Sequence, residues 1–157
     1  LFPEWDTWTE FIVDDCQAGL SLDAMRSSHP IEVPVKNPDE IGQIFDSISY
    51  SKGASLIRQL VKFLGEDSFR NGMRVYLERH KYGNAKTADL WAALGEVSGK
   101  PVPDIMALWT QRIGFPAIEV KQEGAHAIQV TQHRFLATGD VKPEEDETIW
   151  SVPLKIG

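Results

Sequence analysis

The first two thirds of the chain carry apolar residues at helical spacing. Apolar positions three or four residues apart lie on one face of an α-helix, and this period runs from Trp5 to about Ile113. From this pattern we predict a mainly α-helical region, with helices at about residues 5–25, 38–45, 50–64, 67–80, 87–98 and 103–113.

Local signals place the ends of these predicted helices. Asn37 followed by Pro38 is typical of a helix start, because an asparagine side chain caps free N–H groups and proline suits the first helical position. Thr87 is expected to cap a later helix in the same way. Gly65 is a natural C-cap between two helices. Pro30 stops the first helix, because the residue before a proline avoids the helical backbone conformation.

The apolar period changes from helical to alternating at Phe115-Pro116. Alternation is typical of β-strands, so we predict three strands with a turn at Gln122–Ala125 between the first two. The predicted strands lie at about residues 118–120, 127–131 and 148–154. We therefore divide the chain into a helical domain, residues 1–114, and the beginning of a β-domain, residues 115–157. Three strands would leave an exposed sheet edge.

The amino-acid composition and the net charge favour a folded domain that does not bind nucleic acid. The 157 residues are 42% hydrophobic, which suffices for a buried core. The net charge of −7 and the pI of about 5.1 argue against nucleic-acid binding, which needs a basic surface.

The acidic run Glu144–Glu147 is expected to be a solvated loop. Cys16 is the only cysteine, which favours a reducing compartment and a cytoplasmic location. No apolar run reaches the roughly 18 residues of a membrane span.

The segment Phe45–Ser55 contains the strongest candidate for catalytic chemistry. It places Tyr50 at the entrance of a predicted helix whose apolar face begins at Leu56. A phenol has a pKa of about 10, so a tyrosine hydroxyl keeps its proton at neutral pH and can donate to an oxygen that becomes negative in a transition state. The alternative is that Tyr50 is a half-buried aromatic that packs one helix against the next.

Four separated motifs follow one another along the chain: Ser27–Pro30, Phe45–Ser55, Trp109–Pro116 and Gln132–Leu136. In this order they resemble the gluzincin zinc aminopeptidases of the puromycin-sensitive and alanyl types, in particular the fungal cytosolic members. The resemblance implies the end of a thermolysin-like catalytic domain, followed by the first strands of a β-sandwich domain. It also implies that Tyr50 stabilises the transition state of peptide hydrolysis. Phe45 would form a wall of the pocket for the first substrate side chain.

The same resemblance implies a zinc ion that this chain does not bind by itself. The family binds Zn²⁺ through His-Glu-x-x-His on one helix and a glutamate on the next, because this spacing places two imidazoles on one helical face. The chain has four histidines, no two of them four residues apart, and no His-Glu dipeptide. We therefore expect an inactive fragment that begins shortly after the third zinc ligand. Its partners would be peptide substrates and the rest of the parent polypeptide.

The neighbours of Tyr50 also have structural explanations. Phe45 could pack in the core beneath its short helix. Asp46 is expected to cap the turn that leads to Tyr50, with a position facing the pocket as the alternative. Lys52 is expected to be solvated, and Gly53 to allow two helices to approach closely.

Two polar residues outside this segment are expected to be structural. His29, between a serine and a proline, is typical of a hydrogen-bonded histidine and not of a metal ligand. Arg134 is expected to fix the junction between the two domains. Two other classes of function stay open: a helical interaction module in which Tyr50 only packs, and a catalytically inactive relative of the aminopeptidases.

Overall fold

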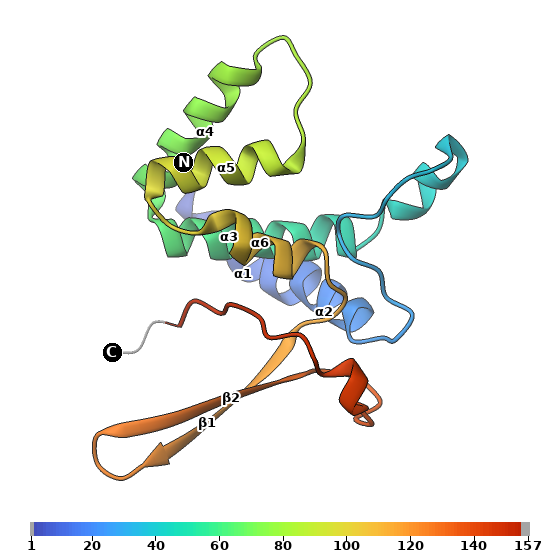
Figure 1. The fold of residues 1–157 in the computed structure, drawn as a ribbon, viewed down its shortest axis with the longest axis vertical. Helices are drawn as coiled ribbons and strands as arrows, with labels where there is room; N and C mark the ends of the chain where they lie inside the picture. The colour runs from blue at the N-terminus through green and yellow to red at the C-terminus, as the bar shows by residue number, and fades with distance from the viewer. Residues whose placement is uncertain (1, 155–157) are drawn as a thin grey trace.

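The computed structural model describes residues 2–154 and shows a body of helices from which a two-stranded hairpin extends (Figure 1). Among these residues, no helix is long and apolar enough to cross a membrane. Short 3₁₀ or π turns, labelled η, join the longer elements. In chain order the elements are η1 (Pro3–Trp5), α1 (Thr7–Phe11), η2 (Ile12–Cys16), α2 (Gln17–Asp23), η3 (Pro38–Ile44), η4 (Ile48–Lys52), α3 (Gly53–Leu64), α4 (Glu66–His80), α5 (Thr87–Ser98), α6 (Val102–Thr110), β1 (Pro116–Glu123), β2 (Ala127–Arg134) and η5 (Pro143–Glu145).

The first predicted helix forms as α1, the π turn η2 and α2 in direct succession. Its apolar residues Trp5, Trp8 and Ile12 are more than half exposed, so this part of the stripe does not enter the core of the described chain. Farther along, Gly19 lets α2 approach the turn before α3. A Cβ at that position would lie 3.2 Å from both the backbone nitrogen of Lys52 and the Cβ of Ser51.

The hydrophobic core lies where α3, α5 and α6 meet. Leu56, Leu60 and Leu64 follow one another at four-residue spacing on the buried face of α3. The other buried members of this core are Trp91, Leu94, Val102, Met106, Trp109 and Trp150. Burying a side chain of this size stabilises a fold by about 1.5–3 kcal/mol. Helix α3 is therefore a firm base for the segment that precedes it.

Helices α4 and α5 approach each other at Gly72. A Cβ added there would lie 2.7 Å from Leu94 Cδ2 and 3.1 Å from Leu94 Cα. By contrast, a Cβ added at Gly53 would meet no atom of the described chain within 4 Å. The prediction that Gly53 allows a close helix approach is therefore wrong. Gly19 and Gly72 have this role, because an added Cβ would lie within 3.2 Å of a neighbouring element at both positions. Gly95 of α5 is also close to α6, with an added Cβ 3.3 Å from Pro103 Cδ.

We expect Gly72→Ala to lower the free energy of unfolding by about 1–3 kcal/mol, as overpacking of a core typically does. The Leu94 backbone cannot move without shifting α5, so the clash outweighs the gain in helix propensity of about 1 kcal/mol. Urea denaturation measures the difference. Gly53→Ala is the matched control and is expected to leave stability equal or higher. A Gly72→Ala chain at least as stable as the Gly53→Ala chain would contradict the packing argument.

The change from helices to strands occurs where the alternating pattern predicted it. Helix α6 ends at Thr110, three residues before the predicted end, and β1 begins at Pro116. The two strands are antiparallel, with Pro116 opposite Arg134 at the open end of the hairpin. The turn between them contains Gly124 at φ 67, a left-handed conformation that glycine adopts without strain. The predicted hairpin and its turn are confirmed.

The predicted third strand is wrong: within the described part, up to residue 154, the segment from Thr148 has no strand partner. The side chain of Gln132 takes the place of a neighbouring strand. Its amide oxygen accepts the Trp150 N–H at 2.9 Å, and its nitrogen donates to the Trp150 carbonyl at 3.0 Å. The Trp150 ring is buried in the helical core beside Trp109. Burial of this ring holds the segment against the helices, while Gln132 ties its backbone to β2 without a strand ladder.

Helix α5 begins with a different cap from the predicted one. Thr87 is the first helical residue, and the residue before it, Lys86, occupies the cap position. The carboxylate of Asp89 accepts the Lys86 N–H at 2.7 Å and so satisfies a free donor at the helix start. At the earlier helix start, Asn37 accepts the Asp39 N–H at 3.2 Å, and that predicted cap is confirmed.

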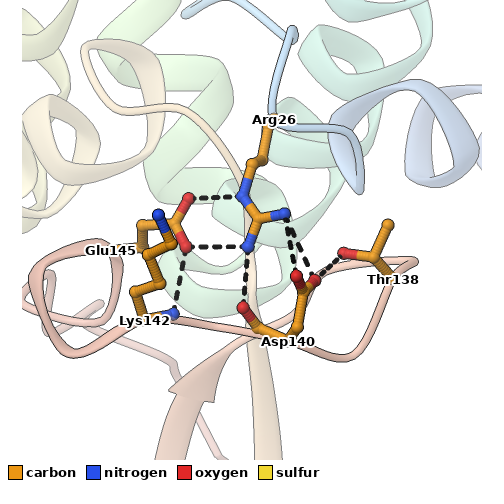
Figure 2. A network of polar contacts seen from close by, with 5 residues as sticks. All are labelled: Arg26, Thr138, Asp140, Lys142 and Glu145. Atoms are coloured by element: carbon orange, nitrogen blue, oxygen red, sulfur yellow. Dashed lines mark hydrogen bonds and ion pairs between the residues drawn. The ribbon is translucent and has the colours of Figure 1, made fainter.

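Arg26 joins the turn after α2 to the loop that follows the hairpin (Figure 2). Its guanidinium donates to both carboxylate oxygens of Glu145, at 2.7 and 3.0 Å, and to the carbonyl of Asp140 at 2.7 Å. The hydrogen bond from Arg26 lowers the pKa of Glu145 to about 2. Asp146 accepts a backbone N–H from the end of β2. The acidic run is therefore not a purely solvated loop, because two of its carboxylates are paired within the chain.

Candidate active site

Tyr50 lies in the π turn η4, which leads directly into α3. The Ser47 carbonyl accepts the backbone N–H groups of both Ser51 and Lys52 at 3.0 Å, which makes the turn wider than an α-helical one. Ile48 is fully buried beneath the turn, whereas Tyr50 is 62% exposed. Within the described residues, Tyr50 therefore stands at the surface and is not a half-buried residue between two helices.

Phe45 lies beside Tyr50 and is 61% exposed. The two ring centroids are 6.1 Å apart, and the ring planes form an angle of 29°. The core position that the sequence left open for Phe45 is therefore wrong for the described chain. The two side chains form an exposed aromatic pair, Phe45–Tyr50, just before α3.

Asp46 holds the backbone between these two aromatic residues. Its Oδ1 accepts the N–H groups of Ile48 at 2.9 Å and Ser49 at 3.1 Å. Its carbonyl oxygen accepts the Tyr50 N–H at 3.1 Å. A carboxylate at the start of a helical turn also faces the positive end of the backbone dipoles. The predicted capping role of Asp46 is confirmed, and it holds the turn that carries Tyr50.

The second carboxylate oxygen of Asp46 contacts His29. Oδ2 lies 2.7 Å from Nε2 of the imidazole, whose Nδ1 lies 2.8 Å from the Pro30 carbonyl oxygen. The prediction of a hydrogen-bonded histidine is confirmed. Burial lowers the pKa of His29, but the hydrogen bonds to Pro30 and Asp46 and the charges of Asp46 and Asp23 raise it above 6.5 overall. Burial raises the pKa of Asp46, but the hydrogen bond from His29 and the two backbone donors lower it overall.

Lys52, at the end of the same turn, is buried. It is 7% exposed, and its Nζ lies 2.8 Å from Oδ2 of Asp23, which is 2% exposed. The ammonium also donates to the Gly114 carbonyl at 3.2 Å. The prediction of a solvated Lys52 is wrong. The residue lies on the buried face of the helix, four positions after Ile48 and four before Leu56, so the chain must supply a counter-charge.

Asp23 connects the turn that carries Tyr50 to the start of the hairpin. Its Oδ1 accepts the Ser28 hydroxyl at 3.0 Å and the Gly114 N–H at 2.9 Å. Gly114 has φ 87, and a Cβ there would lie 2.8 Å from Nε of Arg134. Arg134 thus lies where helices give way to strands, as the sequence suggested. Sequence analysis missed Asp23, although the helical register of Lys52 was a signal that a buried acid must exist.

Within residues 2–154, no three His, Cys, Asp or Glu side chains converge so that they could hold a metal ion. The described residues therefore do not fit a zinc site. They present an exposed phenol on a well-held turn, next to an aromatic ring. Ser49 and Gly53, on either side of Tyr50 in the sequence, line a cavity of about 560 Å³, although its lining among the described residues includes neither Tyr50 nor Phe45. Such a surface can donate one hydrogen bond to a substrate oxygen and contact an apolar side chain.

Comparison with known proteins gives consistent similarities. The Peptidase family M1 domain matches residues 1–109. The chain is 56% identical over 154 residues to the Alanine/arginine aminopeptidase of Saccharomyces cerevisiae, covering 98% of the chain and 18% of that protein. It is 57% identical to Aminopeptidase 2 of Candida albicans, over 98% of the chain and 17% of that protein. It is 44% identical to the Puromycin-sensitive aminopeptidase of Caenorhabditis elegans, over 98% of the chain and 16% of that protein.

Proposed function

The chain belongs to peptidase family M1, and from this we propose that the full-length protein is an aminopeptidase that removes N-terminal amino acids from peptides. The family predicted from the sequence motifs is thereby confirmed, including the higher similarity to fungal members. The chain spans 16–18% of the length of these three relatives, so the activity belongs to a longer polypeptide.

We further propose that the protein uses Zn²⁺, bound by residues outside this chain. Family membership supports the metal. The location outside this chain is inferred from the sequence, in which no two of the four histidines lie four residues apart. We also propose that residues 1–114 end a thermolysin-like catalytic domain and that residues 115–157 begin a β-sandwich domain. The family match supports this division, because it ends at residue 109. The single cysteine supports a cytoplasmic location, although one relative is named "Aminopeptidase 2, mitochondrial".

In this proposal Tyr50 stabilises the transition state. When water adds to a peptide carbonyl, the oxygen becomes negative, and a donor already in position lowers the barrier without reorganisation. The observation that carries the proposal is the contrast within one short turn. The Tyr50 side chain is exposed, while its backbone is held by Asp46 and its neighbours Ile48 and Lys52 are buried. A rigid seat of this kind is what an oxyanion donor requires.

The activity itself is tested with the full-length protein. We expect it to hydrolyse aminoacyl anilides that have a free amino group, releasing the aniline and the amino acid, and not to hydrolyse N-acetylated ones. Removal of metal with a chelator is expected to abolish the activity, and added Zn²⁺ to restore it. Zinc content without hydrolysis would instead support an inactive relative. Absence of both zinc and hydrolysis would support an interaction module.

Phe45→Ala is expected to change the preference of the enzyme among N-terminal side chains. The ring is 61% exposed beside Tyr50, so truncation removes contact surface without opening a core cavity. Loss of one apolar wall costs about 1–3 kcal/mol of discrimination, which corresponds to a change of about 10- to 200-fold in the ratio of kcat/KM for large and small apolar residues.

Phe45→Tyr, which keeps the aromatic wall, is the matched control for this change. It is expected to retain the original preference. Equal kcat/KM ratios in the wild type and in Phe45→Ala would show that Phe45 lies outside the substrate pocket.

A further inference from the structure

We propose that His29, in its doubly protonated form, and Asp46 are positioning residues that hold the turn of Tyr50, so that turnover depends on the protonation of His29. This inference rests on the proposed function, since it concerns the same site. Neither residue is placed in contact with the substrate. Both act through the backbone that orients the tyrosine.

Asp46 holds the turn of Tyr50 through hydrogen bonds to its backbone. Its carboxylate and carbonyl together accept the N–H groups of Ile48, Ser49 and Tyr50. A carboxylate can rotate about its side-chain bonds, and a partner on its other oxygen restricts this rotation and keeps the carboxylate aimed at the two backbone donors. His29 holds that oxygen at 2.7 Å. The imidazole therefore determines the orientation of the cap, and the cap determines the turn.

The hydrogen bonds of His29 depend on its protonation state. Both of its ring nitrogens face groups that can only accept: the Pro30 carbonyl at 2.8 Å and the Asp46 carboxylate. A neutral imidazole has a single N–H and can satisfy only one of them. Both contacts form together only when the ring is an imidazolium. Loss of one proton from His29 therefore breaks either its hydrogen bond to the Pro30 carbonyl or its hydrogen bond to the Asp46 carboxylate.

The charges around His29 favour this protonated state. Asp46 faces the imidazole directly, and Asp23 adds negative charge, although Asp23 itself pairs with Lys52. These groups raise the pKa of His29, and His29 in turn lowers the pKa of Asp46. The charged pair is complete above the lowered pKa of Asp46 and below the raised pKa of His29. It is lost as the pH rises through the pKa of His29.

The test is His29→Gln in the full-length enzyme, with kcat and KM measured from about pH 6 to about pH 9. Glutamine fills similar space but carries no charge and does not titrate. We expect kcat to fall about tenfold at the acidic end, with KM nearly unchanged, because the tyrosine is misplaced and not removed. The ratio of wild-type to variant kcat is expected to approach one as the pH rises and wild-type His29 loses its proton. A ratio that is constant with pH would overturn the proposal.

A double-mutant cycle separates this inference from the proposed role of Tyr50. In a Tyr50→Phe background, His29→Gln is expected to change kcat less than about twofold, because two residues that act through one hydroxyl are not additive. A full tenfold loss in that background would overturn the positioning role. His126→Gln, in the exposed turn of the hairpin, is the control and should leave kcat unchanged at every pH.

If Tyr50→Phe retains full kcat, the proposed role of Tyr50 is refuted. NMR then tests the His29–Asp46 pair independently of activity. The imidazole of His29 is expected to titrate above its ordinary pKa in the wild type and to move down in Asp46→Asn. Identical titration in the two proteins would refute the pair as well.

Discussion

Tyr50→Phe in the full-length protein is expected to lower kcat about 10²- to 10³-fold, the effect typical of deleting one oxyanion donor. The substitution removes a single hydroxyl and keeps the ring, and at 62% exposure it leaves no buried cavity. The lost hydrogen bond forms only in the transition state, so KM is expected to change little. Steady-state kinetics on an aminoacyl anilide measure both constants.

Tyr82→Phe is the matched control for this experiment. Tyr82 is fully exposed in the loop between α4 and α5, so the same atom is removed at a distance from the exposed aromatic pair. We expect its kcat to equal that of the wild type. A Tyr50→Phe enzyme that keeps kcat within about threefold of the wild type, with unchanged metal content, would contradict the proposed catalytic role of Tyr50.

Lys52→Met is expected to lower the free energy of unfolding by about 3–5 kcal/mol, because removal of one partner leaves the other charge buried and uncompensated. Asp23 would keep the hydrogen bonds from Ser28 and Gly114 but lose the ammonium at 2.8 Å. Such a loss is a large share of the roughly 5–15 kcal/mol by which a typical domain is stable. Urea denaturation followed by circular dichroism measures it.

Two further variants show whether the charge causes this loss. Asp23→Asn combined with Lys52→Met removes both charges, and we expect the double variant to be more stable than Lys52→Met alone. Lys62→Met removes an exposed lysine that lies 3.9 Å from Glu66, and such a pair contributes less than about 1 kcal/mol. If Lys52→Met costs no more than Lys62→Met, the buried pair does not stabilise the fold.

These two experiments concern one continuous region of the structure. Lys52 lies two residues after Tyr50, and the pair that it forms with Asp23 anchors the end of the turn that Asp46 caps at its start. The exposed tyrosine is thus held from both sides. A loss of stability in Lys52→Met together with a loss of kcat would indicate that the Lys52–Asp23 pair also supports catalysis.

The helices and the hairpin could be predicted from the sequence because their determinants are local. The period of apolar residues, the Asn37 cap and the glycine at Gly65 act on residues only a few positions away. The same holds for Asp46, whose capped donors lie two and three residues ahead. The proposal of a site at Tyr50 likewise rests on features of the linear chain, namely its motif and its place at a helix entrance.

The contacts that hold this site depend on residues that only folding brings together. Lys52 finds Asp23 on α2 and Gly114 before β1, and the Trp150 ring enters a core formed by distant helices. A pattern along the chain shows which side of a helix is buried, but not which element covers it. For this reason the sequence predicted Lys52 as solvated and residues 148–154 as a strand. A buried charge needs a partner and a large ring needs a cavity, and tertiary packing supplied both.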